Sequence, residues 1–270
     1  MSNKQQSVQE VQRAHLTATL SAGPVAVSSI LPVGASARRK RRSVSLKVAV
    51  VDGCNYGRAG LVAALQDAPQ WNGQRLRPTG VSDLGRLSML HAAGSPDDVS
   101  RFDCLVVRLP AEPRAALSTL IQLGAPGMRL ALTVRLVVLS ALTPELVLGV
   151  LSRVGIRLWV RVVDDRQSLP VLCRAVCPTG ELADSGVMAW SGQLLADNDL
   201  PQLSGKERGV LWQSLQMVTV HALARRQALS SKTLYTQRQG ALHKLGAAHL
   251  KELLRKFRVQ PGNSVIKDEE

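Results

Sequence analysis

An alternation of short apolar runs with helical patterns between residues 46 and 177 constrains this chain more than any other feature. The apolar runs lie at residues 46–51, 103–107, 135–140 and 156–163, with a further candidate at 76–81. The helical patterns lie at residues 57–68, 114–123 and 144–154, and in a last stretch that ends at 176. Strands that are apolar on both faces need helices on both sides of their sheet. Residues 46–177 are therefore expected to form an α/β domain with a parallel sheet.

Residues 203–258 carry helical patterns alone. Ser204, followed three residues later by Glu207, is a capping box that opens the first helix. Further helices are expected at residues 220–226, 229–244 and 247–257. Two short helices joined by a tight turn, the second rich in polar and basic residues, form a helix-turn-helix pattern whose second helix fits the DNA major groove. An ordinary solvated helix in an all-α, four-helix unit is the alternative.

Charge and composition divide the remaining chain. Residues 1–45 carry +6 and read as a basic, disordered tail, residues 46–202 carry +1, and residues 203–258 carry +9. Residues 178–202, rich in Pro, Gly and Ser, read as a linker, and residues 259–270, at −2, as an acidic tail. Clustered positive charge suggests a polyanion partner, usually nucleic acid, although a solubilising surface is the alternative.

Three stretches between Leu203 and Gly246 carry a recognisable pattern. They read Leu203-Ser204-Gly205-Lys206-Glu207-Arg208-Gly209-Val210-Leu211, then Leu223-Ala224-Arg225-Arg226-Gln227-Ala228-Leu229-Ser230-Ser231-Lys232-Thr233-Leu234, then Gln237-Arg238-Gln239-Gly240-Ala241-Leu242-His243-Lys244-Leu245-Gly246. The segment resembles the helix-turn-helix domain of the LuxR/NarL/FixJ family of transcription factors. Gln237, where the family more often has His, is similar to the Rcs-type branch.

This resemblance implies a bacterial transcription regulator that binds double-stranded DNA. The residues expected to contact DNA share the exposed part of the second helix of the motif. They are Lys232, Thr233, Tyr235, Thr236, Gln237, Arg238 and Lys244. The fourth helix resembles the dimerisation helix of the family, which implies a homodimer or a heterodimer with another regulator.

The chain departs from the family at three positions. Met217 and Ala228 stand where the family has glycine, and a non-glycine residue in a left-handed turn costs about 1 kcal/mol. Gly240 lies inside the second helix of the motif and is expected to weaken it by about 1 kcal/mol relative to Ala. These changes affect the expected stability of the domain more than its fold.

A near-neutral α/β domain before such a DNA-binding domain resembles the phosphoacceptor receiver of response regulators. The resemblance implies an acidic pair after the first strand, of which only Asp52 remains, and a phosphoacceptor position that falls on Arg108. Ser140 takes the place of the switch hydroxyl, and the expected Lys falls near Arg161 or Val162. Arg cannot accept a phosphoryl group by this route, so we interpret the domain as a degenerate pseudo-receiver. Arg108 is expected either to pair with Asp52 or to point to solvent.

Other classes of function find little support. No stretch of 18 or more apolar residues is free of charge, so no membrane span is expected. The four Cys follow no zinc spacing and read as reduced cytoplasmic thiols. The five His are scattered, and Asp97-Asp98 and Asp164-Asp165 read as helix caps. We expect no metal, no cofactor, no small-molecule ligand and no enzymatic activity.

The sequence therefore predicts a cytoplasmic, sequence-specific DNA-binding transcription regulator that works without phosphorylation. Its degenerate receiver would serve dimerisation or partner binding. Two alternatives stay open: a regulator still gated by phosphorylation, and a signalling adaptor that acts through protein contacts and binds DNA weakly.

Overall fold

The computed structural model describes residues 45–68, 75–93, 102–131, 135–176, 189–193 and 201–258. The predicted tails, apart from Ser45, lie outside these ranges, as do Asp97, Asp98 and Cys177. Within the described part, Cys54 is exposed, Cys104 and Cys173 are buried, and no cluster of potential metal ligands occurs. None of the helices described is both long and apolar enough to cross a bilayer.

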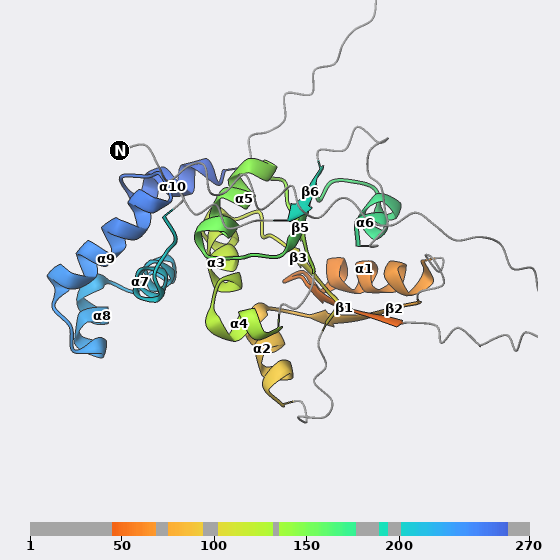
Figure 1. The fold of residues 1–270 in the computed structure, drawn as a ribbon, viewed down its shortest axis with the longest axis horizontal. Coiled ribbons are helices and arrows are strands. Elements are labelled where there is room, and N and C mark those ends of the chain that lie inside the picture. The colour runs from red at the N-terminus through yellow and green to blue at the C-terminus, as the bar shows by residue number, and fades with distance from the viewer. Residues whose placement is uncertain are drawn as a thin grey trace, which may run out of the picture. The chain divides into compact units, whose positions relative to one another are not determined.

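The first part of the fold alternates strands and helices (Figure 1). In chain order they are β1 (Ser45–Val51), α1 (Asn55–Asp67), β2 (Arg75–Val81), α2 (Leu84–Ala93), β3 (Cys104–Arg108), α3 (Pro113–Leu123), α4 (Pro126–Ala131), β4 (Arg135–Leu139), α5 (Pro144–Arg153), β5 (Trp159–Val163), α6 (Leu169–Val176) and β6 (Ala189–Gln193). The sheet order is β2-β1-β3-β4-β5-β6, and β1 to β5 are parallel. The predicted α/β class with a parallel sheet is confirmed.

Each central strand contributes alternate side chains to two apolar cores. In β1, Ala49 and Val51 face the core that contains α2, α3, α4 and α5, whereas Val48 and Val50 face the core under α1 and α6. In β3, Val107 faces the first of these cores and Val106 faces the second. This period of two places helices on both faces of the sheet, which is why the strands are apolar throughout.

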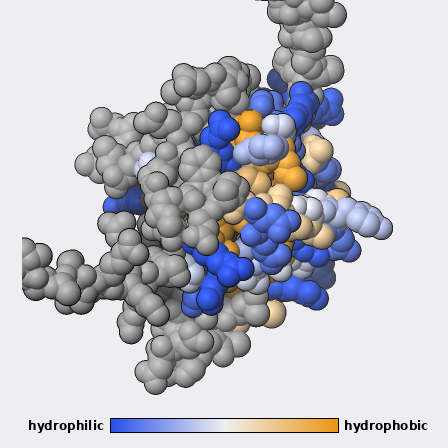
Figure 2. Space-filling model, turned by 90° about the vertical axis from the view of Figure 1, so that its right-hand side faces the viewer, coloured by the Kyte–Doolittle hydropathy of each residue, from blue (hydrophilic) through white to orange (hydrophobic). Residues whose placement is uncertain are grey.

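The sheet edges are formed in different ways. β2, at one end, carries Arg75, Arg77 and Pro78, residue types that discourage pairing with another chain. At the other end β6 pairs antiparallel with β5, from Trp159 opposite Gln193 to Val163 opposite Ala189. The sequence analysis places β6 in the linker and predicts no strand there. On the face shown in Figure 2, hydrophilic residues surround the apolar ones among the coloured atoms.

One expected helix start differs from the structure. α6 begins at Leu169, so neither Asp164 nor Asp165 caps it; the Asp164 carboxylate accepts a hydrogen bond from the Arg166 amide at 3.0 Å instead. The start of α5 agrees with the expected helix at residues 144–154; its N-cap is Thr143, whose side chain makes no capping hydrogen bond.

Four helices follow: α7 (Gly205–Leu215), α8 (Val220–Gln227), α9 (Ser231–Lys244) and α10 (Leu250–Lys256). The expected capping box is present, with the Glu207 amide 3.2 Å from Ser204 Oγ and the Ser204 amide 2.7 Å from Glu207 Oε2. A small core joins α7, α8 and α9 through Val210, Leu223 and Leu234, together with neighbouring apolar residues. The predicted all-α region is confirmed.

One apolar core continues from the α/β part into the helices. Leu117 of α3, Leu215 of α7 and Phe257 after α10 belong to the same buried cluster. Hydrogen bonds also connect the two parts: the Leu203 amide donates to the Arg153 carbonyl at 2.7 Å, and Gln216 Nε2 donates to Ser118 Oγ at 3.0 Å. The helices are therefore packed against α3 and α5 rather than merely tethered to them.

Candidate functional site

The turn between α8 and α9 is left-handed at Ala228, with φ 52° and ψ 37°. Met217, just after α7, also has a positive φ of 62°. These are the two positions at which the chain lacks the glycine of the family it resembles. The expected backbone conformation is thus retained at both positions without glycine.

The N-terminus of α9 is well capped and free of negative charge. Ser230 Oγ accepts a hydrogen bond from the Thr233 amide at 3.0 Å, and the first turn contains no acidic residue. A helix N-terminus carries partial positive charge and favours anions such as phosphate. Lys232, exposed in the same turn, adds a full positive charge there.

The exposed side of α9 forms a polar stripe. Lys232, Thr236, Gln239 and His243 are all exposed and follow one another at intervals of three or four residues, so they share one face of the helix. Of the other predicted contacts, Thr233 and Tyr235 are exposed and Gln237 and Arg238 are half-buried. Sequence analysis missed Gln239 and His243, although their helical spacing from Lys232 marks the same face.

Tyr235 is the centre of a cluster that joins α8 to α9. Its ring lies edge-on to His221, with centroids 6.3 Å apart, and the Arg238 guanidinium lies 5.1 Å from its centroid. His221 Nδ1 is 3.2 Å from Ser231 Oγ. These contacts orient Tyr235 and Arg238 and place His221 beside the predicted contacts.

Lys244 has a different setting from the other predicted contacts. Its Nζ lies 2.7 Å from Glu207 Oε2 and 3.0 Å from the Gln202 carbonyl, so its charge is already paired with α7. Burial opposes the charge of Glu207, yet hydrogen bonds from Lys244 and Ser204 outweigh burial and lower the pKa of this carboxyl. The structure gives Lys244 a role in holding α7 against α9.

The position of Glu207 also explains Gly240. A Cβ at Gly240 would lie 2.8 Å from Glu207 Oε1, closer than real Cβ atoms approach such a group. Gly240 is expected to weaken α9. The absence of a Cβ at this position leaves room for the Glu207 carboxylate, which caps α7 and binds Lys244.

The second candidate site lies where the carboxyl ends of β1 and β3 meet. In a sheet of this order the connections leave β1 and β3 toward opposite faces, which opens a crevice at their ends. Asp52 follows β1 and is buried, and Arg108 ends β3. Arg108 Nη1 is 3.1 Å from Asp52 Oδ2, so the predicted ion pair is present. Arg108 Nε is buried and has no hydrogen-bond partner among the described residues.

Gly57 of α1 permits this ion pair. A Cβ at position 57 would lie 2.7 Å from both Arg108 Nη1 and Asp52 Oδ2. The second oxygen of Asp52 accepts a hydrogen bond from the Cys54 amide at 2.8 Å. The carboxylate is thus held from both sides before any ligand is considered.

Asp165, which follows β5, also interacts with Arg108. Burial raises the pKa of the Asp165 carboxyl, while the positive charge of Arg108 lowers it and the negative charge of Asp164 raises it. Sequence analysis assigned Asp165 to a helix cap and missed this role. The charge of Arg108 thus acts on two carboxylates, Asp52 after β1 and Asp165 after β5.

The other predicted receiver residues do not join this cluster. Ser140 is buried, and its Oγ accepts a hydrogen bond from the Leu142 amide at 3.0 Å, which fixes the turn after β4. Arg161 lies within β5, and its Nη1 donates to the Ala175 carbonyl at 2.8 Å, at the end of α6. Arg161 therefore does not occupy the position of a pocket lysine. Trp159 lies between the guanidinium groups of Arg161 and Arg135, at 4.8 and 5.6 Å.

No family model matches the chain, and no curated protein matches it. Several solved response-regulator structures are similar in fold. RcsB from Salmonella enterica serovar Typhimurium, bound to promoter rprA in the presence of phosphomimetic BeF3-, is 16% identical over 79% of this chain and 98% of that chain, with a TM-score of 0.41. A structure of two RcsB dimers bound to two parallel DNAs is 16% identical over 79% of this chain and 99% of that chain, with a TM-score of 0.42. The response regulator ChrA of a heme-sensing two-component system is 18% identical over 79% of this chain and 96% of that chain, with a TM-score of 0.28. At these identities and scores, function has to be argued from the residues of this chain.

Proposed function

We propose that this chain is a sequence-specific DNA-binding transcription regulator that reads DNA through α9. The observation that carries the proposal is the exposed polar stripe of α9, preceded by a capped, acid-free N-terminus and a tight turn from α8. One helix of this kind fits the major groove, where lysine and arginine pair with guanine or phosphate and glutamine pairs with adenine. Lys232, Tyr235 and Arg238 follow one another at intervals of three residues in the first half of the helix.

The contacts are expected to differ in kind. Lys232, Thr233 and Thr236 are exposed for direct contact with base edges or phosphates, and Arg238, stacked on Tyr235, presents an oriented guanidinium. Lys244 is assigned to the α7–α9 contact instead, because Glu207 already pairs with it.

The α/β domain is proposed to act without phosphorylation. A receiver of the working type holds a metal ion among carboxylates to neutralise the charge of the transferred phosphoryl group. Here the Arg108 guanidinium supplies a fixed positive charge beside Asp52, at the position where an acceptor carboxylate would be required. The domain is then available for dimerisation or for binding a partner protein.

The test is affinity selection of genomic fragments with the full-length protein at about 150 mM salt, followed by sequencing. Arg238→Ala is run beside Lys206→Ala, which removes the same charge from an exposed position on α7. We expect a discrete motif that Arg238→Ala loses, with affinity for it reduced by about 1–3 kcal/mol, and that Lys206→Ala retains. The alternative outcome is that the wild type and both variants retain DNA fragments without a common motif, and that modest salt abolishes this binding equally in all three. That outcome would favour the adaptor function instead.

A further inference from the structure

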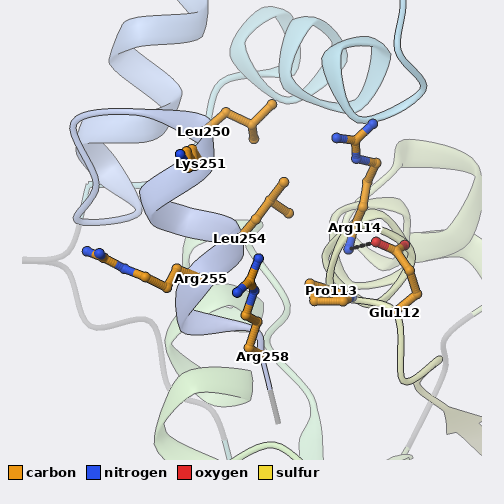
Figure 3. Close-up of a pocket in the computed structure, with 8 residues that line it drawn as sticks. All are labelled: Glu112, Pro113, Arg114, Leu250, Lys251, Leu254, Arg255 and Arg258. Atoms are coloured by element: carbon orange, nitrogen blue, oxygen red, sulfur yellow. Dashed lines mark hydrogen bonds between the residues drawn. The ribbon is translucent and has the colours of Figure 1, made fainter. Parts of the chain in front are cut away.

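A groove runs between α10 and the start of α3 (Figure 3). Its main hollow has a volume of about 710 Å³. The α10 side contributes Lys251, Arg255 and Arg258, and the α3 side contributes Arg114 and Glu112. The wall is thus built from both parts of the chain, and four of its five ionisable groups are cationic.

The positive charge of the groove is only partly balanced by nearby carboxylates. Glu112 is the N-cap of α3, and its oxygens accept hydrogen bonds from the Arg114 and Ala115 amides at 2.9 and 2.6 Å. Lys251, Arg255 and Arg258 are exposed, and none of them forms a salt bridge with a residue that the structure describes. Glu252, the remaining carboxylate of α10, accepts a hydrogen bond from the Ala248 amide at 2.8 Å at the start of the helix.

The cations lie on and just after α10. Lys251 and Arg255 are one turn apart on the helix, and Arg258 follows its end. In Figure 3 Arg258 stands within the groove, whereas Arg255 extends away from Leu250 and Leu254. Leu250 and Leu254, both half-buried, form the neighbouring row and point into the groove in Figure 3. Cations beside two groove-facing leucines match a partner segment that carries both acidic and apolar residues.

The groove continues beyond the main hollow. A second hollow of about 430 Å³ shares Pro113 and Arg258 with the first and adds Arg166, Ala111 and Ala141. The cations are therefore distributed along a surface channel toward the carboxyl end of the sheet. A compact ligand is usually enclosed on most sides, whereas an elongated channel suits a peptide segment.

We propose that this groove binds an acidic, leucine-containing segment of a partner protein. Charge complementarity, the leucines of the wall and the two adjoining hollows argue for this occupant over a compact anion. Because the walls come from α3 and α10, the bound segment holds the DNA-binding helices against the α/β domain. This inference rests on the proposed function, in which the α/β domain binds a partner protein. Peptide binding is measured without DNA, so the groove and the DNA-binding function can fail independently.

The experiment uses the full-length protein and a fluorescent synthetic peptide of about 12 residues, with glutamates at i, i+4 and i+7 and leucines between them. Anisotropy gives its Kd, beside a scrambled peptide and with inorganic tripolyphosphate as competitor. The groove variant is Lys251→Gln/Arg255→Gln/Arg258→Gln. The control, Arg75→Gln/Arg77→Gln/Arg174→Gln, removes equal charge from exposed positions elsewhere.

We expect the groove variant to weaken peptide binding about tenfold, since each exposed ion pair contributes a few-fold, and the control to change it less than twofold. The scrambled peptide should bind more weakly than the designed one. Equal binding of the scrambled peptide, with complete displacement by tripolyphosphate, would show a general polyanion site and overturn the proposal. A loss of DNA affinity in the groove variant as large as that of Arg238→Ala would also overturn the proposal. So would peptide binding that appears only when residues 259–270 are removed, because the groove would then bind that segment of the same chain.

Discussion

Replacing Ala228 with glycine should stabilise the protein. Ala228 holds the left-handed conformation after α8, and it is exposed, so its methyl group contributes little packing. Releasing the left-handed strain is worth about 1–2 kcal/mol, and the greater freedom of glycine in the unfolded chain takes back about 0.4–1 kcal/mol. The net expectation is an increase of about 0.5–1 kcal/mol in the free energy of unfolding.

Urea denaturation followed by circular dichroism and Trp fluorescence measures this difference, and Trp212 in α7 lies within the affected helices. The Tm should rise by about 1–4 °C. The matched control is Ala222→Gly, the same chemical change within the right-handed α8, which should lower stability by about 1 kcal/mol. If both substitutions destabilise by similar amounts, Ala228 carries no left-handed strain and the reasoning is refuted.

Three further predictions concern the two sites. Gly57→Ala should destabilise the α/β domain by about 1–3 kcal/mol, and the cost should shrink in an Arg108→Ala background, because one of the two groups that the new Cβ meets is then gone; additive costs in a double-mutant cycle would contradict this. Glu207 has a lowered pKa in the folded state, so its contribution to stability is present above the ordinary pKa of a glutamate and is lost as the pH falls through the lowered value; Glu207→Gln should flatten the acid limb of stability against pH, and an unchanged limb would count against the Lys244 contact. Arg108→Asp should remain unlabelled by radioactive acetyl phosphate, because Arg161, near which the resemblance puts the pocket lysine, binds the Ala175 carbonyl instead; strong labelling would show that Arg108 alone prevents phosphorylation.

The features that sequence predicted well are those set by nearby residues. The β1 and β4 runs are apolar on both faces, which only a covered parallel sheet explains, and the capping box at Ser204 specifies the start of α7 by itself. The left-handed positions at Met217 and Ala228 followed from the resemblance to a family that has glycine there. The Arg108–Asp52 pair followed from both residues ending neighbouring strands.

The features that sequence missed depend on distant partners. β6 is a short strand with a polar centre, and its pairing is decided by the free edge of β5. Asp165 looks like a helix cap until the loop after β5 is placed beside Arg108. Gly57 and Gly240 look like helix-weakening residues until the carboxylates that approach them are located. In each case the deciding contact joins residues that no local pattern relates.

The continuous core between α3 and the helices α7 and α10 has a consequence for how the molecule melts. Leu215 and Phe257 are buried in the same cluster as Leu117, so separating the two parts would expose apolar surface on both. Heating should therefore give a single calorimetric transition whose enthalpy reflects both parts, rather than two independent ones. Either fragment of a chain cut at residue 201 would lose this shared burial. It should therefore melt well below the full-length protein and expose a new apolar surface that favours aggregation.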